Sequence, residues 1–309
     1  MKVKVPPIKC QGIKTKLVSW ILSNCTLPQN GVWIEPFMGS GVVGFNACPD
    51  RAIFNDINPH VVNFYQAIKE NRITPFIARK YLAEEGEKLK NKGEKYYYEV
   101  RERFNKYQLP LDFLFLSRAG FNGMIRFNAN GKFNVPFCKK TERFSKAYIT
   151  KIVNQIAYVW QSLKFYDWKF CCGDFESLIL DATENDFIYC DPPYYGRHVD
   201  YYNVWGDEEE RRLARVLHQT KARFILSTWH SNKYRTNPCL EKYWSNFYIL
   251  TKEHFYHVGA SENNRNAMLE AIVLNYEPPI PVVEKAMQQL AIFEERARYT
   301  TLALTNYSA

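Results

Sequence analysis

The chain has 309 residues, of which 46% are hydrophobic and 24% charged, and its formal net charge is +9 at pH 7. This composition is typical of a soluble globular protein with a large core, built as one large domain or two moderate ones. No apolar run approaches the roughly 18 residues of a membrane-spanning helix, and the N-terminus lacks the apolar stretch of a signal peptide. These features exclude a membrane protein and predict a cytoplasmic one.

The first 60 residues alternate helix-type and strand-type stretches. A helix is expected at 15–22, and a strand at 31–34 runs into the glycine-rich loop 35–41, after which a helix begins near Val42. A second strand, 52–56, ends in Asp56. Glycines let the backbone approach a ligand closely, and a carboxylate after the second strand is the usual partner of ribose hydroxyls. This part of the sequence therefore predicts a nucleotide-type cofactor site.

The middle of the chain, residues 61–165, carries the positive charge. It holds 20 Lys and Arg against 9 Asp and Glu, a net of +11, so the rest of the chain sums to −2. Spacing is helical to about residue 110, whereas 117–140 is rich in Asn, Gly, Phe and Arg, as in ordered loops or a hairpin. Solvated helix faces are one interpretation. A surface that neutralises nucleic-acid phosphates is favoured, because the segment lies between two cofactor-type motifs.

Strand-type segments return at 168–172, 187–190, 223–227 and 271–274, with a helical stretch at 209–219. This β/α alternation predicts a doubly wound, mostly parallel α/β sheet that carries the basic middle as an insertion. Prolines at 278–281 follow the last strand, and a helical tail is expected to about residue 297. The eight cysteines have no Cys-x-x-Cys spacing, so reduced thiols are expected and no metal site is predicted.

The tetrapeptide Asp191-Pro192-Pro193-Tyr194 directly follows the apolar run 186–190. A buried strand would thus end in a loop that fixes a carboxylate and an aromatic ring. The carboxylate and the carbonyl of Pro192 can accept both hydrogens of an exocyclic amine, while the tyrosine ring stacks on a planar base. A plain turn is the alternative for the tetrapeptide alone. Together with the glycine loop and Asp56, it predicts a site for a planar nitrogen-containing substrate.

From about Lys9 to Tyr276 the chain resembles the Dam/DpnM-like family of site-specific DNA adenine-N6 methyltransferases, the D12 class, group alpha. The resemblance rests on the strings at 35–41, 55–59, 96–101, 121–128, 131–137, 173–175 and 191–194. It implies a Rossmann-like methyltransferase fold with an inserted, mainly helical DNA-recognition domain. It also implies transfer of a methyl group from S-adenosyl-L-methionine to the N6 amine of a flipped adenine, without a covalent intermediate or a metal.

The resemblance assigns roles to individual residues of the site. Asp56 would bind the ribose, Lys14 the cofactor carboxylate, and Asp174 and Phe175 the cofactor adenine. The catalytic residues that it implies are Asp191, Pro192, Pro193 and Tyr194. The cofactor-binding residues that it implies are Cys10, Gly12, Lys14, Glu35, Phe37, Gly39, Gly41, Asp56, Ile57, Asp174, Phe175 and Asp191.

For DNA, Arg suits guanine and Asn suits adenine in the major groove, and Lys suits phosphates. Arg126 is the leading candidate for a base contact, although any of the side chains predicted to bind DNA could instead be structural. The DNA-binding residues predicted are Arg118, Asn122, Arg126, Asn128, Lys132, Asn134, Lys139, Lys140 and Arg143.

The opening motif departs from the family pattern Lys-Trp-x-Gly-Gly-Lys. Cys10 stands in place of Trp and Ile13 in place of Gly, whereas Gly12 and Lys14 fit. The packing that the Trp would supply is therefore absent. We expect cofactor affinity to be lower, or the cofactor to be held by other contacts.

The expected domains are a discontinuous catalytic domain (1–60 and 166–277), a DNA-recognition insertion (61–165) and a C-terminal tail (278–309). Double-stranded DNA is the expected partner, in the nucleoid of a prokaryotic cell. A companion restriction endonuclease is a second partner if the enzyme protects host DNA, and marking DNA for repair is the alternative role. An RNA or protein amine methyltransferase and a catalytically inactive DNA-binding module are the rival functions.

Overall fold

The structure is a computed structural model that describes residues 2–196, 205–255 and 267–279. By its internal packing the chain forms two compact units, Met1–Tyr276 and Glu277–Ala309. Of the second unit only residues 277–279 are described, so the predicted helical tail lies outside the described residues. None of the described helices is both long and apolar enough to span a membrane.

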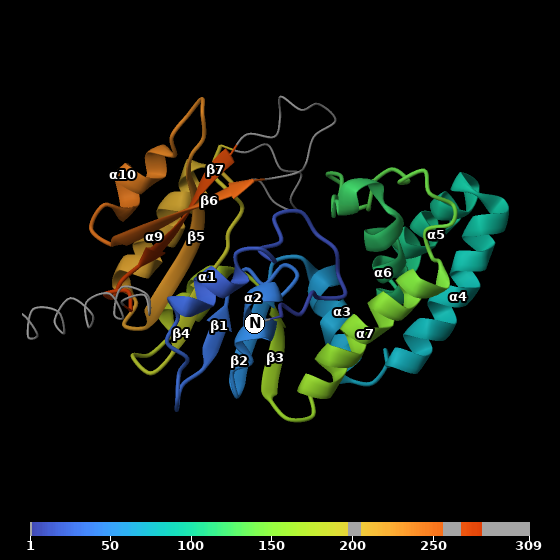
Figure 1. Ribbon diagram of the computed structural model, residues 1–309, viewed down its shortest axis with the longest axis horizontal. Coiled ribbons are helices and arrows are strands. Elements are labelled where there is room, and N and C mark those ends of the chain that lie inside the picture. The colour runs from blue at the N-terminus through green and yellow to red at the C-terminus, as the bar shows by residue number, and fades with distance from the viewer. Residues whose placement is uncertain (1, 197–204, 256–266, 280–309) are drawn as a thin grey trace, which may run out of the picture. The chain divides into compact units, whose positions relative to one another are not determined.

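Within the described residues, seven strands form one sheet in the order β3-β2-β1-β4-β5-β7-β6 (Figure 1). The first five strands of this order run parallel, and β7 is antiparallel to both β5 and β6. The strands are β1 (Trp33–Glu35), β2 (Arg51–Asp56), β3 (Asp167–Cys172), β4 (Phe187–Cys190), β5 (Arg223–Ser231), β6 (Tyr248–Phe255) and β7 (Ala267–Leu274). The expected mostly parallel α/β sheet is confirmed, and β6 is the strand that the sequence pattern did not predict.

Helices connect the parallel strands and form the middle of the chain. Several begin at a proline preceded by a capping side chain: Asn58 accepts a hydrogen bond from His60 N at the start of α3, and Thr74 accepts one from Ile77 N at the start of α4. The described helices are α1 (Val18–Ser23), α2 (Val42–Ala47), α3 (Pro59–Lys69), α4 (Pro75–Lys92), α5 (Glu94–Tyr107), α6 (Pro110–Ala119), α7 (Lys146–Ser162), α8 (Phe175–Leu180), α9 (Asp207–Gln219) and α10 (Pro238–Trp244), with the short 3₁₀ turn η1 (Phe121–Gly123).

The sheet buries apolar side chains on both faces, as a doubly wound sheet requires. Neighbouring residues of β1 show this: Trp33 packs into the core shared with α2 and α3, whereas Ile34 packs into the core shared with α8, α9 and α10. Alternate residues along a strand point to opposite faces. The central strand β1 is therefore held from both sides, which fixes its carboxyl end in space.

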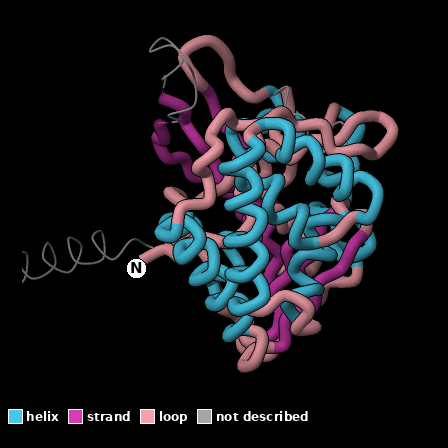
Figure 2. Tube along the Cα trace, turned by 90° about the vertical axis from the view of Figure 1, so that its right-hand side faces the viewer, coloured by secondary structure: helices cyan, strands magenta, loops and turns pink. Residues whose placement is uncertain are grey.

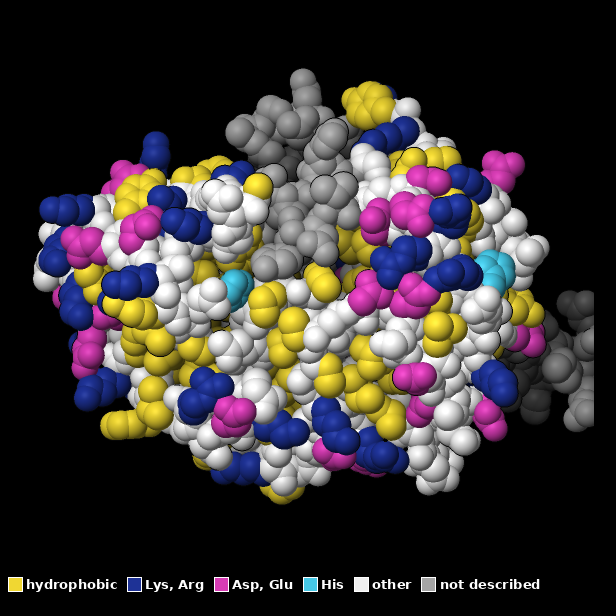
Figure 3. Space-filling view, turned by 180° about the vertical axis from the view of Figure 1, so that it is seen from behind, with side chains coloured by type: hydrophobic (Ala, Val, Ile, Leu, Met, Phe, Trp, Pro, Cys, Tyr) yellow, Lys and Arg dark blue, Asp and Glu magenta, His cyan; other side chains and the backbone are white. Residues whose placement is uncertain are grey.

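The basic middle of the chain folds as α3 to α7 and the loop region 120–145. Figure 1 shows α4 to α7 together on the β3 side of the sheet, and in Figure 2 these helices lie in front of the strands. Lys and Arg side chains are numerous over this part in Figure 3, with acidic side chains between them. The helices share one core with β1 to β3, and residues 61–165 belong to the same compact unit as the sheet.

Candidate active site

The carboxyl ends of β1, β2, β3 and β4 lie at one edge of the sheet, because these strands are parallel. Asn55 joins three of them: its Nδ2 donates to Pro36 O at 3.0 Å and to Gly173 O at 2.9 Å. Its own carbonyl accepts from Met38 N at 2.8 Å. One buried amide therefore locks the loops after β1, β2 and β3 to one another. The order of the strands reverses between β1 and β4, and ligands of open α/β sheets bind at such a point.

The glycine loop after β1 turns at its glycines. Gly39 and Gly41 have φ values of +49° and +73°, in the left-handed region that favours glycine. A Cβ on Gly41 would lie 2.6 Å from the Phe45 ring, so the loop packs too closely for a side chain there. A Cβ on Gly39 would meet no protein atom within 4 Å. The space in front of Gly39 is open to a ligand that approaches the backbone.

Asp56 closes the same loop from the end of β2. Its Oδ2 accepts from Gly39 N and its Oδ1 from Asn58 N, both at 2.8 Å. Burial raises the pKa of Asp56 to about 6, and the two backbone N–H groups oppose that rise. The next residue, Ile57, is 41% exposed and adds an apolar surface. A carboxylate and an apolar side chain side by side suit a ribose and the base attached to it.

Glu35 lies at the end of β1 but points into the protein, with 1% of its surface exposed. Trp33 Nε1 donates to its Oε1 at 3.0 Å. Burial raises the pKa of Glu35 to about 8, against the opposing hydrogen bonds from Trp33 and from the backbone of Gly44. The carboxyl group is therefore largely protonated at neutral pH.

Replacement Glu35→Gln is expected to flatten the pH dependence of stability. The folded-state pKa of about 8 exceeds the ordinary value of 4.5, so the native state holds one extra proton between these values. Its stabilising contribution is complete below pH 4.5 and is lost as the pH rises through 8, by about 1.4 kcal/mol per pH unit. Between pH 6 and pH 8, the free energy of unfolding measured in urea should fall less for Glu35→Gln than for the wild type. Equal falls for the two proteins would contradict this account.

Three aromatic rings gather where β1, β3 and the segment after β4 meet. Phe37 lies 5.1 Å from Phe175 and 5.4 Å from Trp205, measured between ring centroids. Asp174 caps α8 by accepting from Glu176 N at 2.9 Å, and Arg212 donates to the same oxygen at 2.9 Å. The guanidinium also lies over the Phe175 ring. Asp174 is thus both a helix cap and a member of an ion pair.

Asp191 follows β4 directly, and its Oδ1 lies 2.8 Å from the ammonium of Lys14. The Lys14 side chain is 4% exposed, and it also donates to Gly12 O at 2.9 Å. Burial raises the pKa of Asp191, Lys14 opposes the rise, and Glu270 adds to it. The structure thus brings together the opening motif and the tetrapeptide after β4, which are more than 170 positions apart.

Tyr194 is 7% exposed, and its hydroxyl donates to Glu270 Oε2 at 2.6 Å. Lys14 lies over its ring, 4.7 Å from the centroid. Pro192 is buried and Pro193 is half-buried, so the tetrapeptide is firmly packed. A base that stacked on Tyr194 would first have to displace the Lys14 ammonium or turn the loop.

The altered opening motif also reaches the site. Desolvation raises the pKa of the half-buried Cys10 thiol to about 11, and its neighbours include Ser40, Asp56 and Asp191. Gly12 adopts a φ of +74° and offers its carbonyl to Lys14. A small thiol therefore occupies a place between the glycine loop and the tetrapeptide where the family pattern has an indole.

Four residues of this site were not predicted from the sequence: Asn55, Trp205, Arg212 and Glu270. Asn55 stands beside Asp56 and could have been found as a polar residue inside an apolar strand. Glu270 could have been found in the same way, because it interrupts the apolar strand 267–274. Trp205 and Arg212 carry no comparable local signal, since their roles depend on contacts across the fold.

Among the predicted DNA-binding residues, Arg118 lies inside the protein, 5% exposed. Its guanidinium donates to Pro7 O at 2.7 Å and to Gln155 Oε1 at 2.7 Å, which ties the N-terminal segment to α6 and α7. Arg143 Nε donates to the carbonyl of Arg118 at 2.8 Å. Arg118 therefore has a structural role, and its buried guanidinium does not face the surface as the predicted DNA contact requires.

The predicted DNA-binding residues of loop 120–145 form hydrogen bonds within the loop. Arg126 Nε donates to Asn134 Oδ1 at 2.8 Å, and Asn128 Oδ1 accepts from the backbone of Asn130 and of Lys132, which shapes a turn. Asn122 has a φ of +52° within η1. Lys132, Asn122 and Asn128 are exposed, whereas Arg126 and Asn134 are half-buried. The loop is therefore an ordered structure that presents polar side chains.

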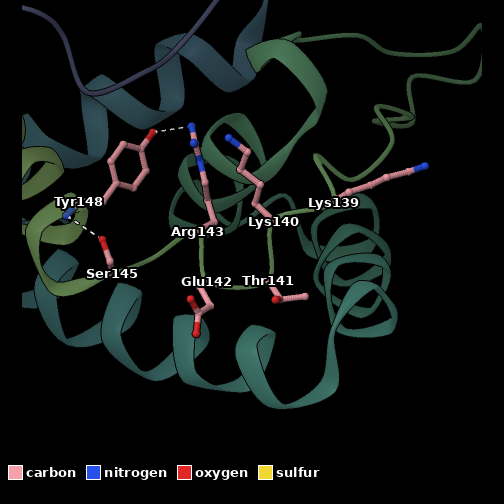
Figure 4. Close-up of a pocket in the computed structure, with 7 residues that line it drawn as sticks. All are labelled: Lys139, Lys140, Thr141, Glu142, Arg143, Ser145 and Tyr148. Atoms are coloured by element: carbon pink, nitrogen blue, oxygen red, sulfur yellow. Dashed lines mark hydrogen bonds between the residues drawn. The ribbon is translucent and has the colours of Figure 1, made fainter.

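A surface pocket of about 490 Å³ lies beside this loop, at the start of α7 (Figure 4). The exposed residues Lys139 and Lys140 contribute two cations to it, and Arg143 Nη2 donates to the Tyr148 hydroxyl at 2.9 Å. The lining residues are Lys139, Lys140, Thr141, Glu142, Arg143, Ser145 and Tyr148. Three cations against one carboxylate favour an anionic partner such as a phosphate.

The strand order and the motifs at the carboxyl edge define a Rossmann-like methyltransferase fold. Residues 11–258 match the family described as D12 class N6 adenine-specific DNA methyltransferase. The match covers most of the chain, and the protein belongs to this family.

Curated relatives agree with the family. The chain is 28% identical over 281 residues to Type II methyltransferase M.FokI of Planomicrobium okeanokoites, covering 87% of this chain and 42% of the relative. It is 32% identical over 204 residues to DNA adenine methylase of Vibrio cholerae, covering 63% of this chain and 66% of the relative. It is 32% identical over 247 residues to DNA adenine methylase of Haemophilus influenzae, covering 74% of this chain and 80% of the relative. The chain thus spans less than two thirds of the first two relatives.

Proposed function

We propose that the protein is a site-specific DNA adenine methyltransferase that uses S-adenosyl-L-methionine. The observation that carries this proposal is the position of Asp191: it lies at the end of β4, beside Lys14, on the strand edge that also holds Gly39 and Asp56. A carboxylate for an amine and a glycine cradle for a cofactor thus share one edge of the sheet. When bound, S-adenosyl-L-methionine supplies a methyl group on a sulfonium.

The residues at this edge fit such a cofactor. The open space before Gly39 admits a ligand to the backbone, and the Asp56 carboxylate can accept ribose hydroxyls while its backbone contacts hold it in place. Phe37 and Phe175 supply apolar surface for a purine, and Asp174 is 47% exposed beside them. Lys14 lies where it can pair with a cofactor carboxylate and so leave Asp191 to the substrate.

Asp191 and the carbonyl of Pro192 would orient the adenine N6 amine. Accepting both amine hydrogens favours a pyramidal nitrogen, whose lone pair can then form the new N–C bond as the S–C bond breaks. The nitrogen afterwards gives up one proton, and the Asp191 carboxylate is the acceptor within reach. Tyr194 is proposed to stack on the flipped base once Lys14 has moved from its ring.

The DNA would lie across the exposed polar residues of loop 120–145. We propose Asn122, Asn128 and Lys132 as contacts to the DNA groove or backbone, and Lys139, Lys140 and Arg143 as phosphate contacts. We propose the hydrogen-bonded pair Arg126 and Asn134 as base contacts. Two relatives are named as a type II methyltransferase and a modification methylase, and a companion restriction endonuclease in a prokaryotic cytoplasm is part of the proposal. The division into recognition (61–165) and catalytic (1–60, 166–277) parts is likewise proposed.

The test is transfer of a labelled methyl group from S-adenosyl-L-methionine to unmethylated plasmid DNA, with nuclease digestion of the product. Label on N6-methyladenine is expected, and sequencing the modified sites would give the recognition sequence. Label that appears on RNA or protein in competition, but not on DNA, would replace the proposal with the rival amine methyltransferase. DNA binding without any methyl transfer would support an inactive DNA-binding module.

A further inference from the structure

An ordered hairpin follows β5 and extends beyond the sheet between β5 and α10 (Figure 1). Ser231 pairs with Thr236 in an antiparallel bridge, and Asn232 N donates to Arg235 O at 2.9 Å. The Asn232 side chain accepts from the backbone N–H groups of Tyr234 and Arg235, at 2.9 Å and 3.0 Å. Such a turn holds its tip in one conformation. The side chains at the tip therefore extend from an ordered backbone.

The hairpin is fastened to the loop that carries the tetrapeptide. Arg235 Nη1 donates to Gly196 O at 2.8 Å, and its guanidinium lies over the Trp229 ring, 5.0 Å from the centroid. Trp229 Nε1 in turn donates to Tyr195 O at 3.0 Å. Two hydrogen bonds thus join β5 and its hairpin to the residues directly after Tyr194. Any substrate at Asp191 would lie close to this connection.

The tip is aromatic and basic. Tyr234 is 74% exposed, and the Lys233 ammonium lies 6.0 Å from the centroid of its ring. Residues 230–237 contain Lys233 and Arg235 but no Asp or Glu. Within residues 2–196, 205–255 and 267–279, neither cation takes part in an ion pair. An exposed ring beside positively charged side chains is the combination that binds nucleic acid, through contact with bases or sugars and with phosphates.

The sheet order places this tip opposite the basic helical part. β4, which ends at Asp191, lies between β1 and β5. The helices α4 to α7 are inserted in the chain between β2 and β3, which lie on the β1 side of β4. The hairpin follows β5, which lies on the other side of β4. A duplex whose target base reached Asp191 would therefore have protein on both sides. We propose that Lys233 and Tyr234 bind the DNA duplex on the side of the target base away from α4 to α7.

This inference rests on the proposed function, and its test separates the two. Binding of the full chain to a labelled duplex should be measured by fluorescence anisotropy over a range of salt concentrations. Tyr234→Ala is expected to weaken binding about tenfold, and Tyr234→Phe to keep it, because the ring provides the contact. Lys233→Ala should reduce the slope of log Kd against log salt by about one unit.

Two controls define the outcome. Phe165→Ala removes an exposed ring, 82% exposed, at the opposite edge of the sheet before β3, and should bind DNA like the wild type. Lys140→Ala, in the proposed phosphate surface, should weaken binding. Thermal melting and cofactor binding check that each variant is folded. Tyr234→Ala and Lys233→Ala variants that bind like Phe165→Ala would overturn the inference. A wild type that methylates no adenine would instead overturn the proposed function.

Discussion

Asp191→Asn is expected to lower kcat for methyl transfer to DNA by about 10²–10³-fold, the loss typical of removing one preorganised polar group from an active site. The amide keeps the shape of the carboxylate but turns one acceptor into a donor, which faces the substrate amine and repels it. Affinity for S-adenosyl-L-methionine should change by less than about tenfold, since Asp56 and the glycine loop are unaltered. Single-turnover kinetics on plasmid DNA would measure the effect.

Two further variants separate this role from a structural one. Asp191 pairs with the buried ammonium of Lys14, and removing one partner of a buried pair destabilises a protein. The double variant Lys14→Met/Asp191→Asn removes both charges, so it should recover stability and still lack activity. Asp181→Asn, an exposed carboxylate after α8, should behave like the wild type. An Asp191→Asn enzyme with more than a tenth of wild-type kcat would refute the assignment.

Asp56→Ala is expected to raise the Kd for S-adenosyl-L-methionine by about 10²–10⁴-fold. Each hydrogen bond to a charged group contributes about 1.5–3 kcal/mol, and two ribose hydroxyls would lose their acceptor. The backbone of Gly39 would also lose the contact that closes the glycine loop. Titration calorimetry would measure the change, with Asp50→Ala as the control, because Asp50 is exposed at the other end of β2.

The pH dependence of binding provides a second readout of Asp56. Its pKa of about 6 lies above the ordinary value of 3.8, so the carboxylate loses its charge as the pH falls through 6. Cofactor affinity of the wild type should therefore fall in that window, whereas Asp56→Asn should show weak binding that varies little with pH. Equal Kd values for the wild type and Asp56→Ala would show that Asp56 does not contact the cofactor.

The sequence alone predicted most strands of the sheet and the edge at which Asp56 and Asp191 lie. Apolar runs of strand length predicted six of the seven strands in the described part of the chain, and the polar residues that end two of them, Asp56 and Asp191, lie where parallel strands place them. The sequence singled out Gly39 and Gly41, and both adopt the left-handed region that glycine enters without cost. The edge strand β6 was missed because Tyr248–Phe255 mixes polar and apolar residues.

The tertiary structure decided which charges and rings meet. Arg118 is predicted from sequence as a DNA contact, yet carbonyls of the N-terminal segment, more than 100 positions away, hold it inside the protein. Lys14 meets Asp191, and Glu270 meets Tyr194, through contacts that span the sheet. Periodicity and residue type act over a few neighbouring residues, so they determine strands, turns and caps. Partners of buried polar groups are selected by packing across the whole fold, because each such group must find a hydrogen bond wherever the chain brings one within reach.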